Sequence, residues 1–296
     1  MTSADHLKAL VRVVCVVVAL PVQAAPPAHG GHEGHGGWQS KAAAPWTDLP
    51  LIEATPGRDR SKAGFRLANL QADSVEAFAP GRQAPWPEGV RFKTDKVAWS
   101  LPVEGGRVVL ESAGVGNYHW LQATEATPQG VKVASTAHYF SNPGPAPTAM
   151  LARRKSDLEI IPSPLPREHN RYRTHQEWTF QVRFQGEPLP GAQVSFASSG
   201  GTRGLYTSDG RGFVRVVFPD DLLPAPGGGH GMGPSNRFLL AVEQDHQNRH
   251  YLTTFSYAYG EDAYAQRSLV LGGGFLALGG LLGLPLILRR KETNHG

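Results

Sequence analysis

Short runs of valine, phenylalanine, tyrosine and threonine, broken every few residues by glycine or proline, fill the chain from about Arg58 to Tyr259. No long stretch here repeats its apolar residues with the 3.6-residue period of an α-helix. Short strands bounded by glycine and proline are typical of antiparallel sheets. The sequence therefore predicts an all-β region, and the roughly 240 residues between the two chain ends are enough for two domains.

We expect these residues to form two immunoglobulin-like β-sandwich domains, at residues 58–150 and 157–262. The strand candidates of the first are "VRFKTDKVAWSL", "RVVLES", "NYHWLQATE" and "VKVASTAHYF". In the second, "GEPLPGAQV" ends one strand before the next begins. "TSDGRGFVRVVF" places Asp209 and Gly210 where a tight hairpin turn needs a positive φ.

The first 24 residues have the layout of a secretory signal peptide, with Lys8 and Arg12 before the apolar run Val13–Leu20. A transmembrane anchor would need about 20 apolar residues, so we predict a signal peptide at residues 1–24, cleaved after Ala24. The single cysteine, Cys15, would be removed with it. An exported chain without a thiol can form no disulfide and no thiolate metal cluster. Copper, nickel or zinc bound through histidine is favoured instead.

Residues 268–288 form an uncharged run of 21 residues, followed at once by Arg289, Arg290 and Lys291. A run of this length spans a bilayer as a helix, and the basic triplet should stay cytoplasmic. We therefore expect a single-pass inner-membrane protein with its soluble domains in the periplasm and a cytoplasmic tail at residues 289–296. The six glycines of the run either suit docking onto a transporter or permease subunit or reflect the frequency of glycine in membrane helices.

Residues 25–57 are rich in proline, glycine and alanine, and we predict a flexible arm there. Its "AHGGHEGHGGW" stretch spaces His29, His32 and His35 three residues apart. Ordering so flexible a backbone costs about 1–2 kcal/mol per residue, so a metal bound there would exchange readily. The alternative is a polar leader whose histidines are incidental.

His119 and His138 are the best candidates for a preformed metal site. The strands that carry them are joined by "TPQG", and a short turn there pairs positions whose numbers sum to 257. His119 then lies opposite His138, and Glu125 lies opposite Lys132. Opposed Cβ atoms are about 4.5–5.5 Å apart, close enough for two imidazoles to share one ion. The alternative is a pair of half-buried histidines that pack or hydrogen-bond, and a bulge would separate them.

Several loop residues of the second domain are weaker metal candidates. His230 and Met232 stand together in "GGGHGMG", a combination suited to copper. His246 and His250 flank the turn "DHQNRH", and closure of that hairpin by residues 244 and 249 would bring Glu243 opposite His250. Each is also an ordinary surface-loop residue.

Enzymatic and nucleic-acid-binding functions are not indicated. The sequence contains no Gly-x-Ser-x-Gly elbow, His-Glu-x-x-His helix, Walker loop or dinucleotide fingerprint. The formal net charge of +4 is small, and part of it belongs to the tail at residues 289–296. We expect a protein that is not an enzyme and binds no nucleic acid.

The succession "LEIIP", "FQVRFQGEPLPGAQVSF" and "SDGRGFVRV" resembles the NikM-like periplasmic family of nickel or cobalt transport accessory proteins. The resemblance covers Asp157 to Tyr259 and implies an exported protein linked to transition-metal uptake. The same glycine and proline theme also recurs in carboxypeptidase-regulatory-like and other sandwich modules that bind nothing.

Together these features predict an exported, membrane-anchored protein that binds a divalent transition metal (nickel, cobalt, copper or zinc) as an accessory to metal uptake or homeostasis. The alternative is a structural or interaction β-sandwich module of the cell envelope with no metal role.

Overall fold

The computed structural model describes residues 46–57, 61–81, 97–112, 118–140, 146–166, 171–223 and 234–261, together with residues 274, 276, 278 and 279. All of them belong to one compact unit, residues 45–296. Sixteen strands and one helix of five residues make up the named elements of the described chain. The predicted all-β class is confirmed.

The first seven strands form a sandwich of two antiparallel sheets with an immunoglobulin-like strand order. One sheet has the order β1-β2-β5, and the other layer has the order β7-β6-β3-β4. The strands are β1 (Leu51–Thr55), β2 (Lys62–Ala68), β3 (Ser74–Phe78), β4 (Ala98–Pro102), β5 (Arg107–Glu111), β6 (Tyr118–Ala126) and β7 (Gly130–Tyr139).

The second sandwich repeats this order. Its smaller sheet runs β8-β10-β14, with β11 on β10, and its larger layer runs β13-β12-β15-β16. The elements are α1 (Thr148–Ala152), β8 (Leu158–Pro162), β9 (Tyr172–Arg173), β10 (Glu177–Phe184), β11 (Glu187–Pro188), β12 (Gln193–Ser198), β13 (Arg203–Thr207), β14 (Phe213–Val217), β15 (Ser235–His246) and β16 (Arg249–Gly260).

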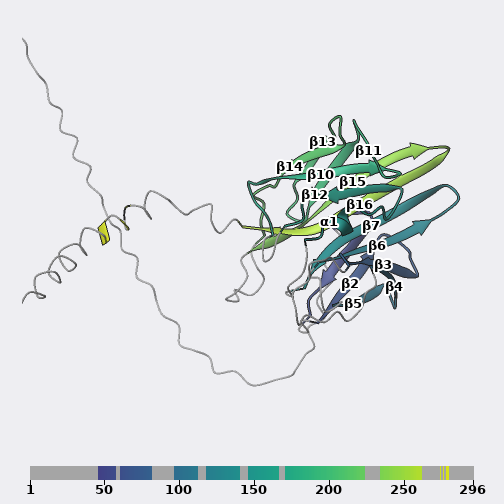
Figure 1. Cartoon of the computed structure of the whole chain (residues 1–296), viewed down its shortest axis with the longest axis horizontal. Coiled ribbons are helices and arrows are strands. Elements are labelled where there is room, and N and C mark those ends of the chain that lie inside the picture. Colours follow the sequence, from purple (N-terminus) through teal and green to yellow (C-terminus); the bar gives the residue numbers. More distant parts are fainter. Residues whose placement is uncertain are drawn as a thin grey trace, which may run out of the picture. The chain divides into compact units, whose positions relative to one another are not determined.

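The two sandwiches share one continuous nine-stranded sheet, because their last strands, β7 and β16, pair in parallel (Figure 1). Ala134 of β7 lies beside Thr254 of β16, so these two side chains lie on the same face. Ala134 packs into the core of the first sandwich, whereas Phe255, which points the other way, packs into the core of the second. The two smaller sheets therefore cover opposite faces of the shared sheet.

Each sandwich has its own apolar core. That of the first gathers aliphatic and aromatic side chains from all three strands of the small sheet and from β3, β6 and β7, including Ile52, Phe65, Leu110, Leu121 and Phe140. That of the second is larger and rich in aromatic rings. Trp120 of β6 belongs to this second core and stacks on Phe255, with ring centroids 5.3 Å apart. Trp120 thus packs the first sandwich's sheet against the second sandwich.

Strand β1 of the first sandwich, together with the preceding Pro50, also contacts the second sandwich where β7 pairs with β16. The hydroxyl of Thr254 donates to the carbonyl of Pro50 (2.7 Å), and that of Ser256 donates to the carbonyl of Ile52 (2.9 Å). Leu51 packs on Leu239 and Leu252 of the second sandwich. The predicted arm at residues 25–57 is therefore too long, because residues 46–55 belong to the folded unit. Leu51 and Ile52 of "LIEAT" are buried there despite the polar, proline-rich sequence around them.

The predicted hairpin at Asp209 and Gly210 is also wrong. β13 pairs with β12 and β14 pairs with β10, so the segment between them crosses from one sheet to the other. The positive φ is at Gly212 (74°), and the Asp209 carboxylate accepts hydrogen bonds from the backbone N–H groups of Arg211 and Phe213. The sequence signal identified a turn but not the sheets that it joins.

Gly130 is expected to be intolerant of any side chain. It begins β7 beside His250, and a Cβ there would lie 2.4 Å from the carbonyl oxygen of His250. Gly130→Ala should therefore force the two strands apart and lower the free energy of unfolding by about 1–3 kcal/mol. Gly210→Ala is the matched control, since nothing lies within 4 Å of its Cβ position. Equal urea midpoints for the two variants would contradict this account of the seam.

A buried charged cluster lies beneath Trp120, where helix α1 leads into β8. The Lys155 side chain is fully buried, with its ammonium 2.8 Å from the carbonyl oxygen of Arg153 and 5.0 Å from the Trp120 ring centroid. Glu159 accepts from the guanidinium of Arg183 (3.0 Å) and lies 3.7 Å from the Lys155 ammonium. Two cations thus share one carboxylate, and burial lowers the pKa of Lys155 to about 8.

This cluster predicts a pH dependence of stability. Below about pH 8 Lys155 is charged in both states, and above that value the folded chain loses the proton while the unfolded chain keeps it up to its ordinary pKa of 10.5. The unfolded state then binds more protons, so stability should rise with pH over this window, by up to about 3 kcal/mol. Urea unfolding between about pH 7.5 and pH 9.5 measures the slope, below the titration of ordinary tyrosines near pH 10. An identical slope in Lys155→Met would contradict the assignment to Lys155.

Candidate functional site

The β6–β7 hairpin places the two central histidines opposite each other, as the sequence predicts. Thr127 and Gly130 exchange backbone hydrogen bonds around a two-residue turn, and the register pairs His119 with His138. Glu125 faces Lys132, with a carboxylate–ammonium distance of 3.3 Å. The predicted register is confirmed, and no bulge separates the two histidines within the hairpin.

Aromatic side chains enclose this histidine pair on the inner face of the first sandwich. The His119 ring is fully buried, and Phe140 and Trp99 lie 5.1 and 5.9 Å from it between centroids. His138 lies 4.5 Å from Phe140 and 5.5 Å from Phe65. All four contacts are edge-to-face, with interplanar angles between 74° and 89°. Both imidazole rings are therefore held in fixed orientations by neighbours from β2, β4 and the end of β7.

The apolar surroundings keep His138 uncharged. Desolvation by burial lowers its pKa to about 4, so the ring is neutral at physiological pH. Neutral imidazole is the form that binds a metal ion, and no proton competes for it under these conditions. A metal ion bound by this pair would therefore be coordinated by imidazole nitrogen atoms.

The second sandwich carries different residues at the equivalent pair. Its β15–β16 hairpin also closes on a two-residue turn, and the pair equivalent to His119 and His138, eight pairs from the closing pair, is Phe238 and Tyr257. Phe238 is fully buried and packs edge-to-face on Phe218 and on Tyr172, with centroids 4.7 and 5.1 Å apart. The first sandwich therefore carries imidazoles at two positions where its internal counterpart carries a purely aromatic core.

The described residues provide only two imidazole rings at this place. Throughout the described ranges, no group of three or more histidine, cysteine, aspartate or glutamate side chains could hold a metal ion. Sequence reasoning found the two histidines but missed Phe65 and Trp99, which come from other strands. The alternating apolar residues of "AGFRLA" and "VAWSL" were the signal that could have placed these rings inside.

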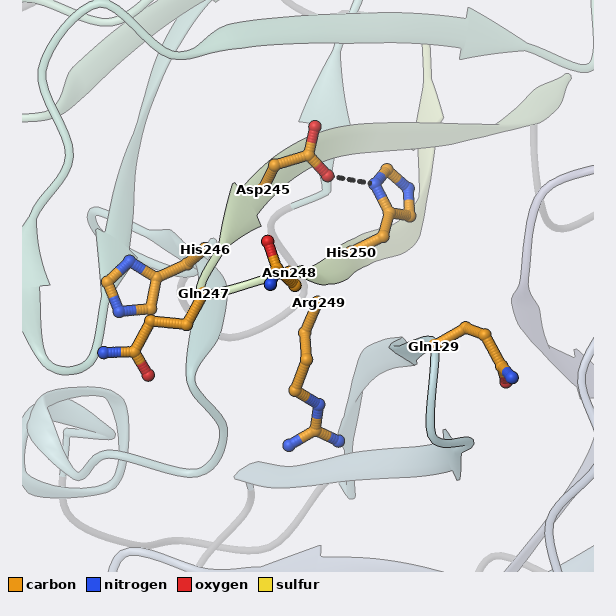
Figure 2. Close-up of a pocket in the computed structure, with 7 residues that line it drawn as sticks. All are labelled: Gln129, Asp245, His246, Gln247, Asn248, Arg249 and His250. Carbon is orange, nitrogen blue, oxygen red and sulfur yellow. Dashed lines mark hydrogen bonds and ion pairs between the residues drawn. The ribbon is translucent and has the colours of Figure 1, made fainter.

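A second histidine cluster lies at the tip of the β15–β16 hairpin, where an open pocket is lined by Gln129, Asp245, His246, Gln247, Asn248, Arg249 and His250 (Figure 2). The Nδ1 of His250 lies 2.8 Å from the Oδ1 of Asp245, and its Nε2 lies 3.9 Å from the Oε2 of Glu243. All three side chains are well exposed to solvent. An exposed pair of this kind contributes little to stability.

The register predicted for this hairpin was wrong by two residues. His246 pairs with Arg249, so Asp245 rather than Glu243 lies directly opposite His250. The chain turns at Gln247 and Asn248, which have φ values of 48° and 61°. A two-residue turn of this type usually contains glycine, and its absence removed the sequence signal.

His246 and His250 do not form a joint site. They stand on opposite faces of the hairpin, and Figure 2 shows the two rings pointing away from each other. The His246 ring instead packs on Phe184, with centroids 5.1 Å apart. His250 keeps its carboxylate neighbours, and His246 belongs to the packing of the second sandwich.

The other predicted site residues lie outside the described residues: His29, His32, His35, His230 and Met232. Of the predicted membrane span at residues 268–288, the structure describes residues 274, 276, 278 and 279, which are helical. Within the described part of the chain, no helix is long and apolar enough to cross a membrane.

Comparison with known proteins found similar structures but no matching family model or curated protein. No family model matches the chain, and no curated protein matches it. Among solved structures, it is similar to a segment of two fibronectin type III domains from chicken tenascin (14% identity, TM-score 0.21) and to the D0-D1 domain of intimin (13% identity, TM-score 0.23). Each alignment covers 71% of this chain and 97% of the other. At these TM-scores the likeness carries no information on function.

Proposed function

We propose that this chain is an exported, membrane-anchored protein that binds a transition metal, nickel, cobalt or copper, as an accessory to metal uptake or homeostasis. The observation that supports it best is the histidine pair of the β6–β7 hairpin. The two imidazoles belong to directly paired residues and contact aromatic rings, at positions that the second sandwich fills with phenylalanine and tyrosine. Buried polar groups that packing does not require are more often kept for function than for stability.

The proposed arrangement assigns separate tasks to separate parts of the chain. His29, His32 and His35 collect the ion in a labile site on the arm, and His119 with His138 hold it in a fixed one. The apolar run at residues 268–288 anchors the protein in the inner membrane and contacts a transporter or permease subunit, with the domains in the periplasm. In this proposal the protein has no enzymatic activity.

Calorimetric titration of the full chain in detergent with copper, nickel, cobalt and zinc tests the proposal. We expect at least one of these ions to bind more tightly than about 10 μM, which corresponds to about 7 kcal/mol. Affinity should fall when His29, His32, His35, His119 and His138 are all replaced by alanine. Binding weaker than this for every ion, or unchanged by the five replacements, would rule the proposal out.

A structural or interaction module of the cell envelope is the second candidate. It is favoured by the lack of a third histidine, cysteine or acidic side chain beside the pair among the described residues. In that case His119 and His138 only pack against their aromatic neighbours. The same titration decides between the two, since this candidate requires that none of the four ions binds specifically.

A further inference from the structure

We infer that strand β13 is an interaction surface for a second copy of this chain, whose own β13 pairs with it antiparallel about a two-fold axis. β13 is the outermost strand of the shared nine-stranded sheet, and its inner neighbour is β12. Within the described ranges, no strand pairs with β13 on the opposite side. The inference is independent of metal binding, so it can fail without affecting the proposed function.

The backbone of β13 directs hydrogen-bonding groups away from its sheet. The carbonyl oxygen of Thr202 accepts from β12 (2.9 Å), and the N–H of Ser208 donates to the residue before β12 (3.0 Å). Because the hydrogen-bonding direction alternates along an antiparallel strand, the intervening Arg203, Leu205 and Thr207 direct their N–H and C=O groups to the outer side. Such a row is a template on which another strand can pair.

Other outer strands of the two sandwiches carry features that hinder such pairing. β4 ends at Pro102, and β14 has the charged Arg215 at its centre. In β5 the backbone of Arg107 already exchanges hydrogen bonds with Glu104, which closes that end of the strand. Proline, charge and covering chain are the usual means of protecting a sheet edge. β13 contains no proline, and its single charged residue, Arg203, is its first.

The side chains of β13 are complementary to themselves in this pairing. A two-fold axis at Leu205 places Leu205 opposite its own copy and Arg203 opposite the partner's Thr207, so no like charges meet along the strand. Leu205 is 68% exposed, more than any other large apolar side chain of the described strands, and the pairing would bury it. On the other face Tyr206 would lie opposite the partner's Gly204, which has no side chain to exclude the ring.

The contact is short, which favours a weak, reversible dimer. Five residues from each chain form a smaller contact than the roughly 20–30 residues a side of a stable interface. The geometry nevertheless permits a covalent trap. Residues of a hydrogen-bonded antiparallel pair have Cα atoms about 5.5 Å apart, within the range of about 4.4–6.8 Å that a disulfide spans. Cysteine at position 205 should therefore link the two copies.

The test uses the full chain in detergent with Cys15→Ser, so that an introduced cysteine is its only thiol. Leu205→Cys is compared with Val109→Cys, a matched control that is also exposed (55%) at the centre of an outer strand, β5. Non-reducing gel electrophoresis follows dimer formation under mild oxidation at micromolar protein. We expect Leu205→Cys to form the disulfide-linked dimer at least about tenfold faster than Val109→Cys, because pairing raises the effective concentration of the two thiols.

Two further variants in the same background, Arg203→Cys and Thr207→Cys, test the register. A mixture of the two should form the mixed dimer faster than either forms a dimer with itself, because position 203 faces the partner's position 207. Equal rates for Leu205→Cys and Val109→Cys would overturn the inference. Self-linked dimers of Thr207→Cys that form as fast as the mixed dimer would overturn it as well, since they exclude a two-fold axis at Leu205.

Discussion

Replacement of Glu159 by glutamine should lower the free energy of unfolding by about 3–5 kcal/mol, the largest effect we expect from a single polar substitution in this chain. Glu159 is almost fully buried and is the carboxylate that faces both Lys155 and Arg183. Its Oε2 accepts from Arg183, and its Oε1, the oxygen near the Lys155 ammonium, also accepts from the backbone N–H of Lys155 (3.0 Å). Removal of its charge would leave two cations buried together with carbonyl oxygens as their remaining neighbours.

The cluster also contacts the end of α1 and strand β6, so the loss of stability should not be confined to the three charged residues. The guanidinium of Arg183 also donates to the carbonyl oxygens of Leu151 and Ala152, at the end of α1. The amide of Gln122 on β6 donates to the carbonyl of Lys155 (3.0 Å). The cluster therefore fixes the segment between the sandwiches against the shared sheet, and its loss should loosen the packing around Trp120.

Chemical denaturation of matched variants measures this effect. Glu187→Gln, on the exposed strand β11, is the control and should change stability by less than about 0.5 kcal/mol. Lys155→Met in the Glu159→Gln background should recover part of the loss, because one of the two uncompensated cations is then removed. A Glu159→Gln protein as stable as the control would show that solvent or local rearrangement neutralises the cluster.

The parts of the fold that were predictable from the sequence are those set by neighbouring residues. The β6–β7 register followed from a short turn and from the complementary pair Glu125 and Lys132, both within one hairpin. The turn at Gln247 and Asn248 left no such signal, since neither residue is glycine, and the predicted register was shifted by two residues. Local turn chemistry thus decided whether a register could be predicted.

The shared sheet was not predictable, because it joins strands that lie about 120 residues apart in the chain. One indication was present. The run "YHWLQA" in β6 is buried on both faces, as expected for a strand covered by a layer on each side. Sequence reasoning treated it as a strand of a separate sandwich, in which one face would contact solvent. The buried cluster of Lys155, Glu159 and Arg183 also left no sequence signal, since its members look like ordinary surface charges.

The double replacement His119→Phe and His138→Tyr should have opposite effects on stability and on metal binding. These residues stand at the equivalent pair of the second sandwich, where the first side chain is fully buried and the second is half-buried, as in the histidine pair. Two desolvated imidazoles would give way to rings that bury more apolar surface and carry fewer polar atoms. The free energy of unfolding should therefore rise by about 1–2 kcal/mol while metal affinity at this site is lost.

Denaturation and titration of the same preparations test both halves of this expectation. Leucine at both positions is a second variant that separates polarity from volume, because it is close to histidine in size and avoids overpacking against Phe140. If packing alone had selected the imidazoles, both variants should lose stability, by about 1 kcal/mol or more. A gain in stability combined with loss of metal binding would mean that the first sandwich keeps its two histidines at the expense of its own core, as expected for residues retained for function.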